Sequence, residues 1–312
     1  MSCIRLSFES LPREALTLNQ DFECNNDIIE RIESLKQLEK KYICIDYLNE
    51  TQGRIVINRE CRARMVEWCY QTIDFFKLSR DTVHVAISCL DRFLSTQQGA
   101  SYLLDARLYQ LACIASLYIA VKVYEPVELH VSLLVQLCRG SYTAEQILET
   151  EQQVLTTLEW AVHPPSAKAF LQLFLALLPR SIGVETKRDI LDLACYQIEM
   201  AVADYDLGVL LKPSATAVAS LLNAFSFCPE VSPHSCSVYL RNLGKSTGCS
   251  RHMRGVSDAK DSMILHLNQE SISGSKSCSK GERRESCIIR EKTIHARLSG
   301  QHLLSPVAVM ER

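Results

Sequence analysis

The chain has 312 residues, a formal net charge of −2 at pH 7 and 47% hydrophobic residues. This length and composition suggest about two globular domains with sizeable cores. The near-balanced charge argues against a general nucleic-acid binder, because neutralising phosphates requires a clear excess of Lys and Arg on one face. The longest apolar run, residues 111–121, is too short to cross about 30 Å of hydrocarbon, so we expect no membrane association.

Fourteen cysteines are present, but the N-terminal residues are not followed by an apolar segment that could serve as a signal peptide. We therefore expect free thiols in a soluble, intracellular protein. The sequence contains no Cys-x-x-Cys pair and no His pair at zinc spacing, so we expect neither a metal site nor a cofactor.

Apolar periodicity in the first half predicts helices. Residues 1–26 form an expected flexible leader, and residues 27–48 show the spacing of an amphipathic helix laid on a domain. Five further helices are then expected, over residues 59–76, 79–94, 103–123, 130–138 and 143–160. The helix at 103–123 is apolar on nearly every side, which predicts that the other helices surround it. We expect residues 27–162 to form the first domain.

His163-Pro164-Pro165 marks the expected domain boundary, because residues before proline leave the α region and proline lacks a backbone donor. A second domain is expected over residues 163–245, with helices at 167–178, 185–205, 213–225 and 233–243. Residues 246–281 are rich in Ser, Gly, Lys and Arg, which predicts a disordered insertion. Helical spacing returns at residues 285–298, which either complete the second domain or lie outside it, and a tail occupies 299–312.

Three ordered motifs give the chain a family resemblance. Residues 61–68 read Cys-Arg-Ala-Arg-Met-Val-Glu-Trp, residues 90–95 read Leu-Asp-Arg-Phe-Leu-Ser, and residues 118–125 read Tyr-Ile-Ala-Val-Lys-Val-Tyr-Glu. Together they resemble the cyclin box, most strongly over residues 59–165 and more weakly to about 245. The resemblance implies an all-α fold of two tandem five-helix domains. The wording resembles most narrowly the D-like cyclins of diatoms and related stramenopiles.

The resemblance also implies a kinase-binding groove with one cation and one anion, Lys122 and Glu151. The residues implied as its apolar floor are Ile119, Val123, Val154, Leu155 and Leu158. Charge-assisted bonds from such a pair to the backbone of a kinase helix would be short and directional. Without the resemblance, the preferred explanation is that Lys122 is a cation complementing the dipole of its helix and that Glu151 is a solvated residue.

Two further sets of residues carry over from the family. Arg62 and Asp91 match a structural ion pair between the first two helices of the box. A candidate docking patch for substrate or inhibitor peptides comprises Met65, Trp68 and Gln110. Three neighbouring positions, Arg64, Cys61 and Gln71, depart from the family pattern, so a core role for Trp68 stays open as the alternative.

The implied function is that of a regulatory subunit that binds and activates a cyclin-dependent protein kinase in the nucleus and cytoplasm. The alternative is a cyclin-fold scaffold in transcription that holds DNA or peptides, as general transcription factors and pocket proteins do. Catalysis is not expected, since the sequence carries no Gly-rich phosphate loop, no Gly-x-Ser-x-Gly elbow and no His-Glu-x-x-His helix. The sequence leaves open which kinase is bound.

Overall fold

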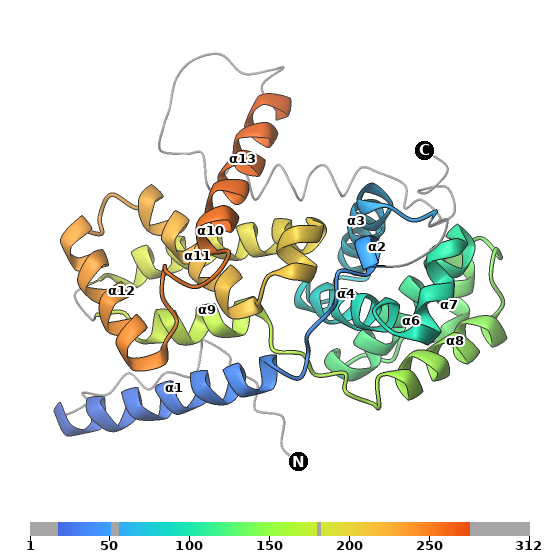
Figure 1. Ribbon diagram of the computed structural model, residues 1–312, viewed down its shortest axis with the longest axis horizontal. Coiled ribbons are helices and arrows are strands. Elements are labelled where there is room, and N and C mark those ends of the chain that lie inside the picture. Colours follow the sequence, from blue (N-terminus) through green and yellow to red (C-terminus); the bar gives the residue numbers. More distant parts are fainter. Residues whose placement is uncertain (1–17, 51–55, 180–181, 275–312) are drawn as a thin grey trace.

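The computed structural model describes residues 18–50, 56–179 and 182–274, and side chains within 25–49, 56–179 and 182–268. Over these residues the fold is all-α, without strands, and its helices form two bundles side by side (Figure 1). Each bundle has its own hydrophobic core. The two bundles are joined by residues 161–166, a segment outside any helix that contains Pro164 and Pro165.

The N-terminal bundle surrounds one apolar helix. Its main helices are α3 (Arg59–Phe75), α4 (Asp81–Leu94), α6 (Ala106–Tyr124), α7 (Val131–Leu137) and α8 (Ala144–Thr157), with short α5 (Gln97–Ala100) and η2 (Ser101–Leu104) between α4 and α6. Every residue of α6 from Tyr109 to Val121 is buried, and α4 and α8 pack along its sides. By length and composition α6 could also cross a bilayer, but here its apolar surface is covered by neighbouring helices.

The C-terminal bundle repeats this plan around α11. Its helices are α9 (Ala167–Ala176), α10 (Val184–Ala203), α11 (Pro213–Phe227), α12 (Pro233–Thr247) and α13 (Val256–Gly274), with the π-helical turn η3 (Asp206–Leu210) after α10. Small residues dominate the buried surface of α11: Ser214, Ala215, Ala217, Ala219, Ser220 and Ala224. They allow α9, α10 and α13 to pack closely against it.

The prediction of a disordered insertion at residues 246–281 is wrong for the part that forms helix α13. Val256, Ala259, Met263 and Leu267 are buried, and their spacing of three or four residues places them on one helical face. This face packs on α11 and α10. The helix therefore supplies the fifth member of the second bundle, a role that the sequence assigned as one alternative to residues 285–298, which lie outside the described residues. The predicted tail at 299–312 lies outside them as well.

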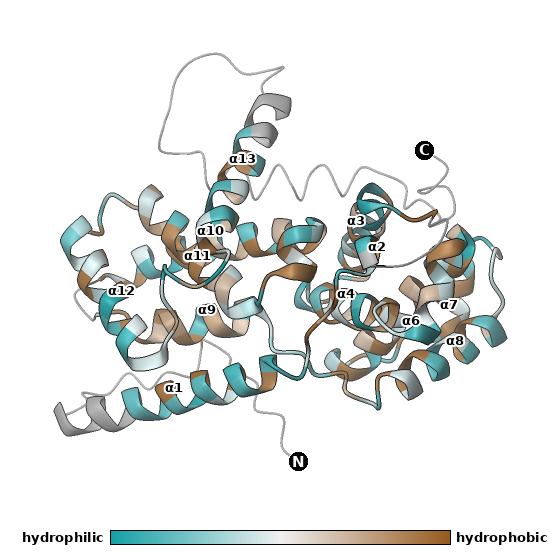
Figure 2. Ribbon diagram, viewed as in Figure 1, coloured by the Kyte–Doolittle hydropathy of each residue, from teal (hydrophilic) through white to brown (hydrophobic). Residues whose placement is uncertain are grey.

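Helix α1 (Leu18–Glu39) differs from the prediction in its bounds and in the bundle on which it packs. It begins within the predicted leader and ends before the predicted end at residue 48, where a separate short helix α2 (Tyr47–Glu50) follows. It also packs on α9 and α12 of the C-terminal bundle, not on the N-terminal bundle with which the sequence grouped it (Figure 1). Hydrophobic and hydrophilic residues intermix along α1 (Figure 2), and Ile28 and Ile32 enter the C-terminal core.

The end of α1 is tied to the start of α11. The buried carboxylate of Glu39 accepts bonds from the backbone N–H of Ser214 at 2.7 Å and from its hydroxyl at 2.9 Å. A carboxylate in this position satisfies N–H groups that a helix start leaves without partners and complements the helix dipole. The helix that precedes the first bundle in sequence thus belongs to the second in space.

Candidate functional site

Helices α6 and α8 of the N-terminal bundle position the predicted cation and anion. Asp105 caps α6 by accepting from the N–H of Arg107 at 2.7 Å. Thr143 and Gln146 form a capping box that starts α8. Because the two helices pack on each other, Lys122 in the last turn of α6 faces Glu151 in the middle of α8.

Lys122 and Glu151 form an ion pair at the edge of the bundle. The Glu151 side chain is 7% exposed and the Lys122 side chain 40% exposed, so the anion is buried while the cation reaches solvent. The Lys122 ammonium also lies 4.3 Å from the ring centroid of Tyr118, a cation–π contact. Burial first, and the Glu151 charge second, raise the pKa of Tyr118. An ammonium has three donors, so Lys122 can bond a partner's carbonyl while it holds Glu151.

The apolar residues predicted around the pair divide into two groups. Ile119, Val154 and Leu158 are buried and belong to the core of the bundle. They cannot touch a partner, which corrects their assignment to the floor of a groove. Leu155 is half-buried and Val123 is 37% exposed, and these two remain available to a partner.

Two exposed residues close in sequence to Lys122 or Glu151 were missed by the sequence reasoning. Leu148 is 43% exposed and precedes Glu151 by three residues, so it shares a face of α8 with Glu151. Tyr124 is 40% exposed and follows Lys122 by two residues; its ring lies 5.5 Å from that of His163. The spacing of three residues between Leu148 and Glu151 could have predicted from the sequence that both lie on one face of α8.

Arg62 and Asp91 form a bidentate ion pair between α3 and α4, with both side chains almost fully buried. The Nε of Arg62 donates to Oδ1 of Asp91 at 2.9 Å and Nη2 to Oδ2 at 2.8 Å. The Tyr47 hydroxyl also donates to Asp91 at 2.8 Å. Burial alone would lower the pKa of Arg62, but the Asp91 carboxylate more than compensates and raises it.

Arg62 also reaches across to the C-terminal bundle, which sequence reasoning did not anticipate. Its Nη1 donates to the carbonyls of Val202 at 2.7 Å and Ala203 at 3.2 Å, at the end of α10. A Cβ on Gly208 would lie 3.0 Å from Nη2 of Arg62 and 3.1 Å from the Val202 carbonyl, so the glycine permits this close approach. The pair therefore positions two bundles as well as two helices.

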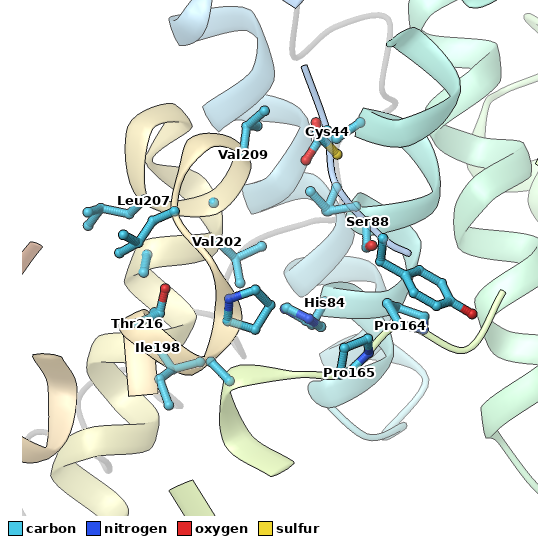
Figure 3. Close-up of a pocket in the computed structure, with 18 of the residues that line it drawn as sticks. Cys44, His84, Ser88, Pro164, Pro165, Ile198, Val202, Leu207, Val209 and Thr216 are labelled. Atoms are coloured by element: carbon cyan, nitrogen blue, oxygen red, sulfur yellow. The ribbon is translucent and has the colours of Figure 1, made fainter. Parts of the chain in front are cut away.

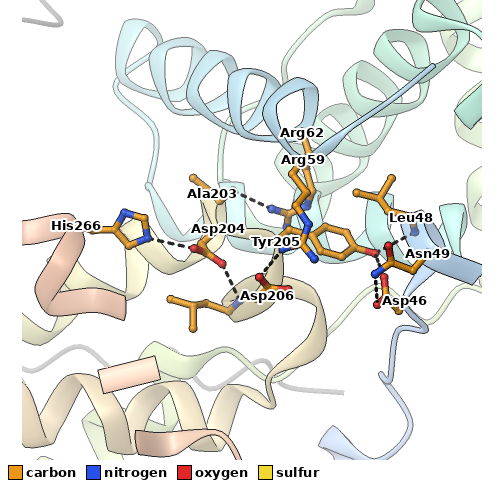
Figure 4. Close-up of polar contacts among 11 residues, drawn as sticks. Asp46, Leu48, Asn49, Arg59, Arg62, Ala203, Asp204, Tyr205, Asp206 and His266 are labelled. Carbon is orange, nitrogen blue, oxygen red and sulfur yellow. Dashed lines mark hydrogen bonds and ion pairs between the residues drawn. The ribbon is translucent and has the colours of Figure 1, made fainter. Parts of the chain in front are cut away.

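Tyr205 forms a second set of polar contacts that joins the bundles (Figure 4). Its hydroxyl donates to Asp46 at 3.0 Å and accepts from the N–H of Leu48 at 3.1 Å, in the segment between α1 and α3. The guanidinium of Arg59, from the start of α3, lies over the Tyr205 ring and pairs with Asp206. These contacts fix the segment between α1 and α3 against both bundles.

The candidate docking patch is buried. Met65 and Trp68 are at most 1% exposed, and Gln110, at 2%, accepts a bond from the Tyr142 hydroxyl at 2.8 Å. A peptide cannot reach these side chains in this conformation, which contradicts the docking assignment and supports the core role for Trp68. The apolar periodicity of α3 cannot distinguish a residue at the edge of the core from one inside it.

A cavity of about 70 Å³ lies between the bundles (Figure 3). His84 and Ser88 of α4 line it from one side, and Ile198 and Val202 of α10 from the other. The Nε2 of His84 is buried without a hydrogen-bond partner, and burial lowers the pKa of this imidazole. The cavity therefore lies in the contact between the bundles.

Comparisons with known proteins give the sequence and fold similarities of this chain. Residues 28–163 match the family model for the cyclin N-terminal domain. Cyclin-A3-2 of Oryza sativa subsp. japonica is 27% identical over 77% of this chain and 57% of its own length. Cyclin-B1-1 of Arabidopsis thaliana is 25% identical over 89% of the chain and 61% of its own length. The chain thus spans about three fifths of the length of such relatives.

Solved structures show the same fold. A viral cyclin from herpesvirus saimiri superposes with a TM-score of 0.56 at 21% identity, covering 76% of this chain and 99% of the viral protein. A chain of the CAK complex of Chaetomium thermophilum bound to ATP-γ-S superposes with a TM-score of 0.51 at 13% identity, covering 95% of this chain and 89% of that one. Residues 28–163 are thus similar to the cyclin N-terminal domain, and the described chain as a whole has the same fold as these two solved structures.

Proposed function

We propose that this chain is a non-catalytic regulatory subunit that binds and activates a cyclin-dependent protein kinase. The single observation that supports it is the Lys122–Glu151 pair, a buried anion and a half-exposed cation at the joint edge of α6 and α8. Val123 and Tyr124, which follow Lys122 in sequence, and Leu148, which precedes Glu151 by three residues, are exposed at the same two helices. Such a face can hold an amphipathic helix by apolar contact while its charges fix the orientation.

Activation follows from where the kinase is held. Protein kinases require an ion pair between a lysine of the nucleotide site and a glutamate of helix αC. A partner that binds αC only in its active position shifts the population toward the active kinase. The chain supplies binding free energy and no reacting group.

The test is co-purification with a kinase subunit, followed by a kinase assay on the complex. Lys122→Met and Glu151→Leu, singly and together, retain side-chain bulk and remove the charges. Truncating one partner of a buried interface charge pair costs about 2–5 kcal/mol, or about 30-fold or more in affinity. Arg64→Met and Glu60→Leu alter an exposed pair on α3 of the same bundle and should bind as wild type. Equal binding and activation by all variants would refute the assignment.

We also propose a cyclin subtype and a cellular localisation for the chain. The Val-Lys-Val-Tyr-Glu-Pro wording at 121–126 supports a D-like subtype, whereas the relatives named above carry A-type and B-type names. A phylogeny that groups the chain with A-type or B-type sequences would reject the D-like subtype. Localisation in nucleus and cytoplasm accompanies the proposed role, and fluorescence microscopy of the tagged chain would test it.

A further inference from the structure

Residues 41–46, which join α1 to α2, alternate between anchored and solvent-exposed side chains. Three anchored residues hold the segment in place. The guanidinium of Arg92 lies 4.4 Å from the ring centroid of Tyr42, Cys44 lines the cavity between the bundles (Figure 3), and Asp46 accepts from Tyr205 (Figure 4). Burial raises the pKa of the Cys44 thiol to about 12, as expected for a side chain directed inward.

The residues between these anchors face solvent. Lys41 is exposed, Ile43 is 65% exposed and Ile45 is 46% exposed. Residues 43–46 belong to no helix. Within the described part of the chain the amides of Ile43 and Ile45 have no hydrogen-bond partner, whereas the Ile45 carbonyl accepts from the N–H of Tyr47 at 2.8 Å. The segment therefore has the period of two of a strand, and it presents two free backbone amides as an unpaired strand edge does.

The surroundings of this edge are basic. Lys40 and Lys41 precede the isoleucines directly, and Lys212 stands next to Ser214, the residue that Glu39 binds at the end of α1. Among the described residues none of these three lysines forms an ion pair. The neighbouring carboxylate of Glu39 is buried and occupied by Ser214, so it does not neutralise them at the surface.

We infer that residues 41–45 are a docking edge for an extended, acidic segment of a partner protein. The partner segment would accept hydrogen bonds from the free amides of Ile43 and Ile45 and place apolar side chains at alternate positions beside the two isoleucines. It would direct carboxylate or phosphate groups toward Lys40, Lys41 and Lys212. This is strand addition, in which main-chain bonds give affinity and alternate side chains give specificity. It goes beyond the proposed kinase interface, since none of these residues belongs to the Lys122–Glu151 face.

The anchors are what make the edge suitable for binding. A flexible linker would lose conformational entropy when a partner ordered it. Tyr42, Cys44 and Asp46 hold this segment against both bundles before any partner arrives, so less entropy is lost on association. A nucleic acid fits the site less well, because two exposed isoleucines at the centre of the edge offer its phosphates nothing.

The experiment uses the full chain and a set of fluorescein-labelled octapeptides in which Val alternates with Thr. The peptides differ only in the pair of residues placed at each end, which is Asp-Asp, two phosphoserines, Ser-Ser or Lys-Lys. We expect the two anionic peptides to bind with measurable anisotropy change, the Ser-Ser peptide more weakly, and the Lys-Lys peptide not at all. Ile45→Asp should weaken anionic peptides about tenfold or more, and Lys41→Glu about fivefold or more. Methylating the amide nitrogen of the central valine should abolish binding, because it removes a strand bond.

Control variants distinguish binding at residues 41–45 from nonspecific peptide binding. Val184→Asp changes a residue that is 75% exposed at the far end of α10 and should leave peptide binding unchanged. Because Ile43 and Ile45 are exposed, their substitution should not alter the melting temperature. Lys122→Met should bind the peptides as wild type, so the docking edge stands or falls independently of the kinase interface.

Several outcomes would overturn the inference. No binding by any peptide, binding indifferent to Ile45→Asp, or undiminished binding of the methylated peptide would each do so. Tighter binding of a 12-base-pair DNA duplex than of the anionic peptides would assign the surface to nucleic acid. Self-association that Ile45→Asp abolishes would make the occupant a second copy of the chain. Binding of a peptide of residues 305–312, in which Val307, Val309 and Glu311 alternate, in preference to the panel would make it the chain's own C-terminus.

Discussion

The two bundles share a plan but differ in what stabilises them and in what they expose. In the N-terminal bundle the central α6 buries large side chains such as Tyr109, Leu117 and Ile119, whereas α11 buries mainly Ala and Ser. One buried polar contact of the second bundle joins two amides, with Asn223 donating to Gln197 at 2.8 Å. A buried polar contact of the first bundle is the Arg62–Asp91 ion pair, whose arginine also bonds the second bundle.

This difference indicates that the two bundles have different structural roles. The N-terminal bundle carries the accessible Lys122–Glu151 pair, while the described ends of α11 carry no comparable pair. The C-terminal bundle instead receives α1 and, with η3 and Tyr205, fixes the segment that leads into the N-terminal bundle. A repeated architecture therefore supports different functions because a few surface and interface residues differ.

The largest expected effect comes from the residue that joins the bundles. Arg62→Ala should lower the free energy of unfolding by about 3–5 kcal/mol, because it leaves Asp91 buried without its cation. Arg64→Ala, two residues along the same helix, removes an exposed pair and should cost at most about 0.5 kcal/mol. Urea denaturation followed by circular dichroism measures both. Similar values for the two variants would show that the Arg62–Asp91 pair does not stabilise the fold.

Removing a core side chain from α13 tests whether this helix completes the second bundle. Met263 is 1% exposed, so Met263→Ala should cost about 2–4 kcal/mol through lost burial and a cavity. Leu265, two residues away, is 61% exposed, and Leu265→Ala should change stability by at most about 0.5 kcal/mol. Thermal unfolding of both variants decides between a packed helix and the disordered insertion that the sequence predicted.

The attachment of α1 to the second bundle gives a smaller effect. Glu39→Ala removes the carboxylate that caps α11 and should cost about 1–2 kcal/mol. Glu33→Ala, at an exposed position of α1, is the matched control and should be nearly neutral. Hydrogen exchange should show faster exchange at the start of α11 in Glu39→Ala alone. Faster exchange in the N-terminal bundle instead would contradict the position of α1.

The smallest expected effect is a pH dependence of the contact between the bundles. Burial lowers the pKa of His84 below its usual 6.5, although Asp81 and the Pro165 backbone partly oppose this. The unfolded chain therefore binds a proton more readily, so the contribution of His84 is complete above pH 6.5 and is lost as pH falls through its lowered pKa. Stability of His84→Asn should fall less between pH 6.5 and 5 than that of wild type. The exposed His252→Asn is the control.

The local helices were predictable because each depends on a short stretch of chain. The spacing of apolar residues placed α3, α4, α6 and α8 close to their observed bounds, and two prolines marked the division between bundles. The motifs singled out Lys122 with Glu151 and Arg62 with Asp91, and the structure brings both pairs together. Periodicity and family wording are sufficient for these features, since both are properties of neighbouring residues.

Only the tertiary structure decided which apolar residues reach the surface and which helices share a core. It buried Met65 and Trp68, left Leu148 exposed, joined α1 to the far bundle and ordered α13. A helical face shows that a residue is turned toward some neighbour, but not how deep it lies or to which bundle that neighbour belongs. Those properties depend on contacts between residues far apart in the chain, such as Glu39 with Ser214 and Arg62 with Val202.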